Sequence, residues 1–399
     1  MSNQRVHHSN KWVVLAISFA MMMCFALSLQ ALPPLFEQIM KDVPFSNSQA
    51  GILMGSYAIP GIFLPFVVAY LANRVDIKKL IIGALIIMMI GLVAFSFAGS
   101  FSLLVVFRLV AGIGATVLVV LSPLLITMYF DQKNIGIAMG IFNIAVPLGT
   151  VLAANFFGSL GRLLGWRVIL VGVAGFLGVV LLLVIFALFL QKGEASTHSP
   201  DLDKKSAPRF RGSLSLWLLT AIWALANFQL IAYVTFGPQF YQSLGVSVQR
   251  AGFLTSLVML ASLFLAPLIG VAFDKTGRKK PYLIIGIALI LISFVALATH
   301  FPGLPLWAFA LGIGFTPIAV FAFAHIPETV RPHEVGMGMG MLTVASNLGT
   351  TVGPSAFGSI LDQTQGNFTV TFMFLAAISL ILIAFSLGLK SGNSRSESR

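Results

Sequence analysis

The residues able to do chemistry stand out because they are polar groups inside long apolar runs. Arg108 is the one ionic residue well inside such a run, about seven residues from its end and roughly 10 Å deep at 1.5 Å per residue. A buried cation is costly and faces either a cavity or a partner. Arg108 therefore either binds an anionic solute, or pairs with the first run or with backbone carbonyls and organises the first half of the chain.

Other polar residues in these runs are weaker candidates for lining a solute path. Each is equally explained by a hydrogen bond between helices, which is worth about 1 kcal/mol. They are Gln30, Tyr57, Asn143, Gln229, Tyr233 and Asn347. His325 can titrate near neutral pH, and Glu328 follows it, but a structural bond near the end of the run is the alternative.

The acids show a contrasting pattern. All twelve Asp and Glu residues fall in loops, in the tail or at the ends of apolar runs, so no buried-acid proton relay is visible. No catalytic constellation, metal-ligand cluster or nucleotide-binding loop G-x-x-x-x-G-K-[ST] occurs, and Cys24 is the single cysteine. An enzyme, a cofactor and ATP-driven transport are therefore not expected.

Composition identifies the solvent that must surround these residues. The 399 residues are 58% hydrophobic and 9% charged, against about a quarter charged in soluble domains, and the mean hydropathy is +0.98. Twelve apolar runs are long enough to span a bilayer. They cover 12–36, 49–72, 80–99, 101–130, 135–160, 167–190, 213–241, 250–273, 281–299, 303–327, 335–360 and 367–389.

The polar connections divide the chain. Residues 191–212 are polar and charged and read as a cytoplasmic linker, whereas 390–399 read as a disordered cytoplasmic tail. Two six-helix bundles are expected, at 1–190 and 213–389. With a cytoplasmic N-terminus, only Lys41, Arg162, Arg167 and Arg250 among the loop cations lie outside. The net charge of +12 thus lies along the inner leaflet and does not indicate nucleic acid.

The two halves repeat each other. A shift of 200 residues aligns glycines of the fourth and fifth runs with those of the tenth and eleventh. Matching pairs include Gly112 and Gly312, Gly114 and Gly314, Gly140 and Gly340, and Gly149 and Gly349. An offset of six helices preserves the direction through the membrane, so a parallel repeat is predicted, with a substrate site near the midplane between the halves.

Several motifs resemble the major facilitator superfamily. The segment from Gly270 to Lys280, with Asp274, Gly277 and Arg278, resembles its cytoplasmic signature G-x-x-x-D-x-x-G-R-[KR]. The first-half counterpart is degenerate around Asn73 and Arg74. The stretch from Arg108 to Ala115 resembles the fourth-helix pattern R-x-x-x-G-x-G-A. The glycines and Pro354 of the eleventh run resemble an antiporter pattern that many members carry in the fifth.

The resemblance implies an all-α integral membrane fold and a secondary transporter that works by alternating access. It ranks Gln30, Arg108 and Tyr233 first as substrate-binding residues, and loosely suggests a cyanate-transporter-like branch. Asp274, Gly277, Arg278, Asn73, Arg74, His325 and Glu328 are the expected gating residues; a simple solvated turn is the alternative for Asp274.

The expected activity is movement of a small solute, favoured as an organic or small anion, across the cytoplasmic inner membrane. A proton-coupled efflux antiporter for drugs or metabolites is the alternative. The expected partners are the solute, the lipid bilayer and a proton or other coupling ion, and the protein is expected to be a monomer.

Overall fold

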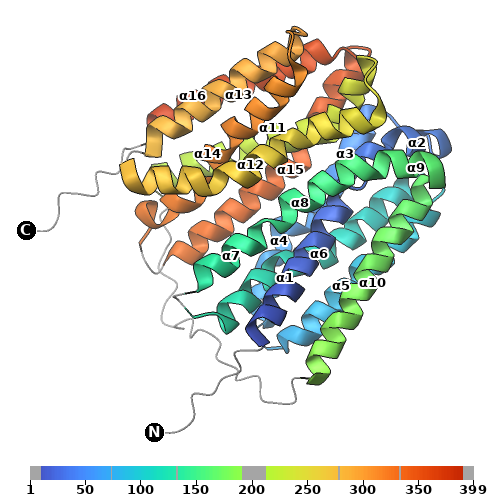
Figure 1. Ribbon diagram of the computed structural model, residues 1–399, viewed down its shortest axis with the longest axis vertical. Helices are drawn as coiled ribbons and strands as arrows, with labels where there is room; N and C mark the ends of the chain where they lie inside the picture. Colours follow the sequence, from blue (N-terminus) through green and yellow to red (C-terminus); the bar gives the residue numbers. More distant parts are fainter. Residues whose placement is uncertain are drawn as a thin grey trace, which may run out of the picture. The chain divides into compact units, whose positions relative to one another are not determined.

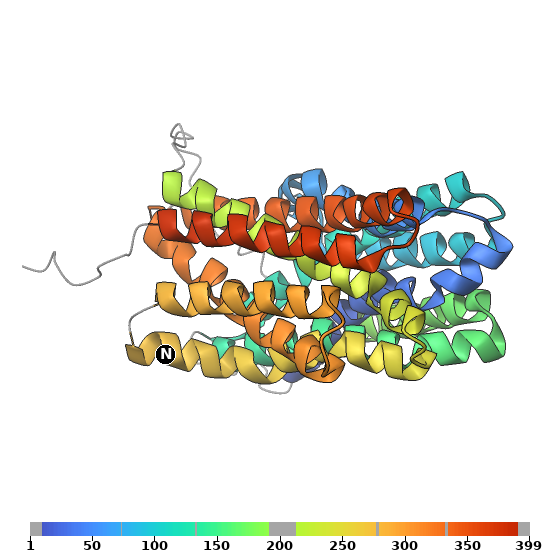
Figure 2. The ribbon, with the colours of Figure 1, turned by 90° about the horizontal axis from the view of Figure 1, so that it is seen from above.

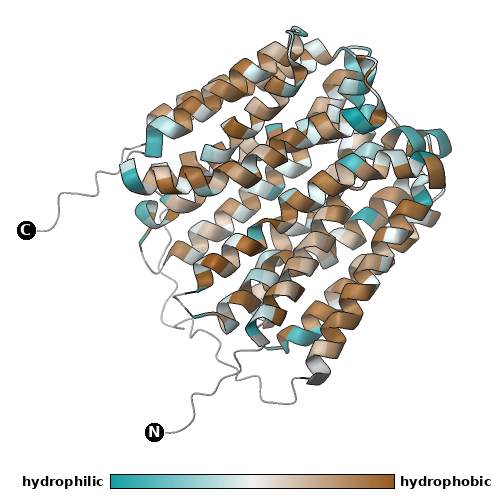
Figure 3. Cartoon of the chain, in the orientation of Figure 1, coloured by the Kyte–Doolittle hydropathy of each residue, from teal (hydrophilic) through white to brown (hydrophobic). Residues whose placement is uncertain are grey.

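The computed structural model describes residues 10–72, 74–131, 134–190, 213–276, 279–331 and 334–389 (Figure 1). The predicted linker 191–212 and tail 390–399 lie outside these residues. Every regular element in the described part is helical. Apolar residues run along the helices and hydrophilic ones gather at their ends (Figure 3). This pattern confirms the predicted all-α integral membrane fold.

Contacts group the helices into two compact units, and the division falls inside one helix. Unit 1 comprises the described residues of 1–45 and 56–203; unit 2 comprises those of 46–55 and 204–399. The helix α3 (Asn47–Ala58) therefore begins in unit 2 and ends in unit 1. The sequence placed all of residues 1–190 in one bundle, so segment 46–55 is where the observed grouping differs.

Unit 1 contains the first six predicted spans except the beginning of the second, and several of them are interrupted. The first span is α1 (Asn10–Gln30), a 3-10 turn (Pro33–Leu35) and α2 (Phe36–Asp42), and the second ends with α4 (Pro60–Ala72). Three long helices are α5 (Ile77–Phe97), α6 (Phe101–Tyr129) and α10 (Trp166–Leu190). The fifth span consists of α7 (Ile135–Asn143), α8 (Ala145–Leu152), a π-helical segment (Ala153–Phe157) and α9 (Gly158–Leu164).

The described part of unit 2 contains six further α-helices with fewer interruptions. They are α11 (Leu214–Ser243), α12 (Val248–Thr276), α13 (Lys279–Ala298), α14 (Leu304–Thr329), α15 (Val335–Gln363) and α16 (Phe368–Gly388). Helices α13 and α16 lie side by side (Figures 1 and 2). Ser213 and Asn367 begin α11 and α16 by accepting hydrogen bonds from backbone amides within the first turn, as N-cap residues do.

Eleven helical stretches of the described chain are long and apolar enough to cross a membrane. They correspond to eleven of the twelve predicted runs; the remaining one is α15, whose many Gly, Ser and Thr residues make it less apolar. Large apolar side chains point outward, including Phe63 at 69%, Phe97 at 77% and Leu163 at 80% exposed. Lipid is the solvent that makes such exposure favourable.

The predicted repeat appears as the same close packing in both units. A Cβ on Gly112 of α6 would overlap the carbonyl of Tyr57, and a Cβ on Gly312 of α14 would overlap that of Val258. Tyr57 and Val258 are equivalent at a shift of 201 residues, which also matches Gly51 with Gly252. The glycines thus let each unit's fourth span lie directly against its second, as small residues do in membrane bundles.

Candidate functional site

The Arg108 side chain is enclosed within unit 1, where it is 1% exposed. Its guanidinium contacts the end of α1: Nη1 donates to the carbonyl oxygen of Ser28 at 2.7 Å, and Nη2 donates to that of Leu29 at 2.8 Å. The planar fork of arginine suits two neighbouring acceptors of this kind. Arg108 therefore holds α6 to α1, which is the second of its two interpretations from sequence.

A proline explains why one of these two carbonyls, that of Leu29, lacks a helical donor. In a helix, the carbonyl of Leu29 would accept from the amide of residue 33, and that of Gln30 from residue 34. Pro33 and Pro34 have no amide hydrogen, and α1 ends at Gln30. A buried carbonyl without a donor is unfavourable. Arg108 supplies the donor that Pro33 cannot give to Leu29.

Tyr57 at the end of α3 covers the same guanidinium. The Cζ atom of Arg108 lies 4.3 Å from the centroid of the Tyr57 ring, within the range of a cation–π contact. The ring is 2% exposed and lies 5.9 Å, centroid to centroid, from that of Phe25 on α1. Two predicted site residues, Arg108 and Tyr57, are thus brought together.

Gln30 is the last residue of α1, directly after the carbonyl that Arg108 binds. It is 4% exposed, and among the described residues its Oε1 atom has no hydrogen-bond partner. The guanidinium bound at the end of α1 comes from α6, and the residue after the two bonded carbonyls offers an acceptor oxygen. Both side chains are enclosed in this structure, so a contact with solute stays a prediction for Gln30 as it does for Arg108.

The two α11 candidates lie inside unit 2. Gln229 donates from Nε2 to the carbonyl oxygen of Leu375 at 2.7 Å and to Oγ of Ser379 at 2.8 Å, both on α16. The hydroxyl oxygens of Tyr233 and Tyr241 lie 3.0 Å apart, and both side chains are fully buried. In this structure these residues stabilise the packing of unit 2.

The asparagines differ from each other. Asn347 on α15 is half-buried and donates to the carbonyl oxygen of Thr343 at 2.9 Å, within its own helix. Asn143 is exposed at the end of α7, where the fifth span is interrupted. These observations do not test a solute role for either asparagine, so the two roles stay predictions.

A charged cluster joins the ends of α13 and α14 in unit 2. Glu328 accepts from Nζ of Lys279 at 2.6 Å, and its other oxygen lies 2.7 Å from Nδ1 of His325. The His325 ring is 5% exposed and stacks on Phe321 at 4.7 Å. Two predicted gating residues, His325 and Glu328, therefore form one cluster, and Lys279 is the member that the sequence did not single out.

The other predicted gating residues are only partly described. Arg74 is exposed, with its guanidinium 4.5 Å from the ring centroid of Tyr70. Asn73, Gly277 and Arg278 lie outside the described residues, as does the side chain of Asp274.

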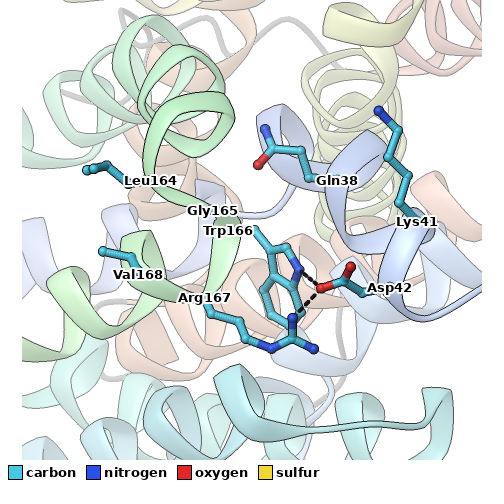
Figure 4. Close-up of a pocket in the computed structure, with 8 residues that line it drawn as sticks. All are labelled: Gln38, Lys41, Asp42, Leu164, Gly165, Trp166, Arg167 and Val168. Atoms are coloured by element: carbon cyan, nitrogen blue, oxygen red, sulfur yellow. Dashed lines mark hydrogen bonds and ion pairs between the residues drawn. The ribbon is translucent and has the colours of Figure 1, made fainter.

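A cavity of about 460 Å³ opens at one end of unit 1, away from these candidates (Figure 4). Its polar centre is Asp42, which accepts from Nε1 of Trp166 at 2.9 Å and pairs with Arg167. The remaining lining residues are Gln38, Lys41, Leu164, Gly165 and Val168. The negative charge of Asp42 at the centre of the cavity is thus balanced by Arg167, and its carboxylate also accepts a hydrogen bond from Trp166.

Comparison with known proteins places the chain in a family. The profile of the Major Facilitator Superfamily matches residues 18–249 and 228–398. The chain belongs to this superfamily. It is similar to the lysosomal dipeptide transporter MFSD1 of Danio rerio, with 26% identity over 88% of this chain and 80% of that protein. A probable nitrate/nitrite transporter, NarK2 of Mycobacterium tuberculosis, is 23% identical over 88% and 90%.

Solved structures share the fold. A bacterial homolog of the human lysosomal transporter Spinster, in an inward-facing and unoccupied conformation, matches with a TM-score of 0.78 at 18% identity, over 96% of this chain and 97% of that one. A mutant of the nucleoside transporter NupG matches with a TM-score of 0.74 at 17% identity, over 94% and 99%. This superfamily member is thus a multi-pass membrane protein for secondary transport of a small solute, and not an enzyme. The cyanate-transporter-like branch stays a prediction.

Proposed function

We propose that this transporter moves a small solute that carries a negative group, such as a carboxylate or a small inorganic anion. The observation that carries the proposal is the charge of Arg108, held by α1 and α6 inside unit 1. A fixed cation in a low-dielectric interior attracts anions strongly and repels cations.

The placement of the acids supports the same solute class. The described carboxylates lie at helix ends or in loops, among them Glu37, Asp42, Asp76, Glu328 and Asp362. None of the described membrane-spanning interiors therefore offers a carboxylate to a cationic drug. The names of two relatives are consistent with this: a dipeptide carries a carboxylate, and nitrate and nitrite are anions.

The proposed location is the cytoplasmic membrane with both chain ends on the cytoplasmic side. Its support is the distribution of Lys and Arg over the connections, which places most of them on one side. A protease added to sealed, right-side-out vesicles should then leave a tag at either terminus intact. Cleavage of one tag and not the other would contradict the proposal.

The solute class is tested with purified protein in liposomes. We expect uptake of a labelled dipeptide, a labelled monocarboxylate or nitrate above protein-free vesicles, and no protein-dependent movement of tetraphenylphosphonium. Repeating the uptake with and without a proton gradient tests for a coupling proton. Movement of the lipophilic cation together with no uptake of any anion would overturn the proposal in favour of drug efflux.

A further inference from the structure

Helix α3 is the one element of the described chain that belongs to both units. Residues 46–55 pack in unit 2, whereas Tyr57 packs on Arg108 and beneath Gly112 in unit 1. Only Ser56 separates the two parts along the helix. The contacts that hold residues 46–55 in unit 2 therefore restrain the same helix whose Tyr57 covers Arg108.

The start of α3 is capped in two ways. The first four amides of a helix have no partner within it. Ser46 and Gln49 form a reciprocal capping box: the Ser46 amide donates to Oε1 of Gln49 at 2.9 Å, and the Gln49 amide donates to Oγ of Ser46 at 3.3 Å. This box leaves the amides of Asn47 and Ser48 without a partner from α3.

Asp362, at the end of α15 and more than 300 residues away, binds these two amides. Its Oδ1 accepts from the Asn47 amide at 3.0 Å and from Asn47 Nδ2 at 2.9 Å, and its Oδ2 accepts from the Ser48 amide at 2.7 Å. A carboxylate at a helix N-terminus is further favoured by the helix dipole. Residues 46–55 carry no charged side chain, so Asp362 supplies the charge in this contact.

The rest of this contact is made of small residues. A Cβ on Gly51 would overlap the Pro354 carbonyl, and a Cβ on Gly358 would overlap the Asn47 carbonyl. The hydroxyl oxygens of Ser48 and Ser359 lie 2.9 Å apart. The backbones of α3 and α15 thus meet directly at these points.

We propose that Asp362 is a latch that holds the first half of α3 on α15, and that its release is a step in the transport cycle. The carboxylate is exposed, so water can replace the Asn47 and Ser48 amides as its hydrogen-bond partner. The contact is therefore reversible. Because α3 continues to Tyr57, release frees the segment next to Arg108 to move with unit 1. The role in the cycle rests on the proposed function; the role in holding α3 does not.

The first test is amide hydrogen exchange on the full-length protein in nanodiscs. Asp362→Asn keeps the shape but removes the charge and part of the acceptor capacity. We expect exchange in residues 46–55 to rise about tenfold. The matched control is Asp76→Asn, which alters a carboxylate that caps α5 locally by accepting from the Lys78 amide at 2.9 Å. It should affect the start of α5 and leave 46–55 within twofold of wild type.

Unchanged exchange of 46–55 in Asp362→Asn, or an equal rise in the Asp76→Asn control, would overturn the latch. A second measurement keeps Asp362 in place, which covers the case that Asp362→Asn does not fold. In a Cys24→Ser background, Ser48→Cys and Ser359→Cys place two thiols where the hydroxyls lie 2.9 Å apart. Oxidation should join them, since a disulfide needs only a small further approach.

The cross-link is expected to lower uptake of the labelled anion at least tenfold, and dithiothreitol should restore it; each single cysteine variant should be insensitive to oxidant. Full uptake by the cross-linked protein would overturn the role of release in the cycle. Failure of the proposed function shows separately, as absence of anion uptake by the unlinked wild type. In that case the exchange measurement alone decides whether Asp362 holds α3.

Discussion

Arg108 donates to the carbonyl oxygen of Leu29 at 2.8 Å, at the position where Pro33 deprives that carbonyl of its helical donor. The contact joins the break in α1 to α6 through one side chain. Pro33, four residues after Leu29, has no amide hydrogen and so leaves this carbonyl free to accept from Arg108. The guanidinium satisfies the carbonyl at the helix break, and the carbonyl helps to hold the guanidinium.

Replacing Arg108 by Gln should destabilise the protein. Two buried carbonyls, on Ser28 and Leu29, would lose their guanidinium donors, at roughly 1–3 kcal/mol for each unsatisfied group. The measurement is the thermal midpoint of detergent-solubilised protein, followed by size-exclusion chromatography. Arg162→Gln is the control, because its 3.0 Å pair with Glu37 is half-exposed and worth about 1 kcal/mol or less. A variant at Arg108 with wild-type stability but no anion uptake would assign the guanidinium to the solute instead.

Replacing Gly112 by Ala should separate α6 from α3. The added Cβ would overlap the Tyr57 carbonyl, which cannot yield without moving the backbone. We expect a loss of about 1–3 kcal/mol, typical of overpacking, and a lower yield of folded protein. Gly83→Ala in α5 is the matched control, since nothing lies within 4 Å of the added atom, and it should be at least as stable as wild type because alanine favours the helix. Equal stability of both variants would contradict the close packing.

The stabilisation by Asp362 should depend on pH. Partial burial opposes ionisation, but hydrogen bonds from Ser48, Ser46 and Asn47 outweigh it, so the pKa of Asp362 lies below its ordinary value. A depressed pKa contributes stability that is complete above the ordinary value of about 4 and is lost as the pH falls through the lowered value. The difference in thermal midpoint between wild type and Asp362→Asn should be constant from pH 8 to about 5 and shrink below about 4. A difference that grows on acidification would exclude this origin.

Replacing Glu328 by Gln should loosen the ends of α13 and α14. The change removes the charge that pairs with Lys279 at 2.6 Å and contacts His325 at 2.7 Å. Because Glu328 is about one-third exposed, the expected loss is about 1 kcal/mol, diminished at high salt. Hydrogen exchange at the start of α13 should rise in low salt. No change at either salt concentration would show that the cluster does not hold these helices.

The fold was largely predictable from sequence, for a physical reason. A bilayer demands about twenty apolar residues per span, so the runs locate the helices, and shared glycines such as Gly112 and Gly312 disclose the repeat. The interruption within the fifth span was not predicted. The π-helical segment Ala153–Phe157 contains the polar residue Asn155 but no proline or glycine that would mark a break in the run.

The candidate site was predictable only in part. A charge deep in an apolar run identified Arg108 and a pairing with the first run or with backbone carbonyls, but no side-chain pattern indicates which carbonyls of α1 accept from it. Asp362 was recognised only as an acid at the end of a run. The capping box of Ser46 and Gln49 marks the start of a helix, yet nothing local indicates a partner more than 300 residues away.

The repeat also has a consequence for the response to membrane voltage. Where unit 1 has Arg108, the equivalent position of unit 2 has Ala308, fully buried and neutral. An elementary charge crossing the whole membrane potential exchanges about 2.3 kcal/mol per 100 mV. Any step that displaces Arg108 along the field is therefore electrogenic even if the solute crosses as a neutral species, whereas the same displacement of Ala308 transfers no charge.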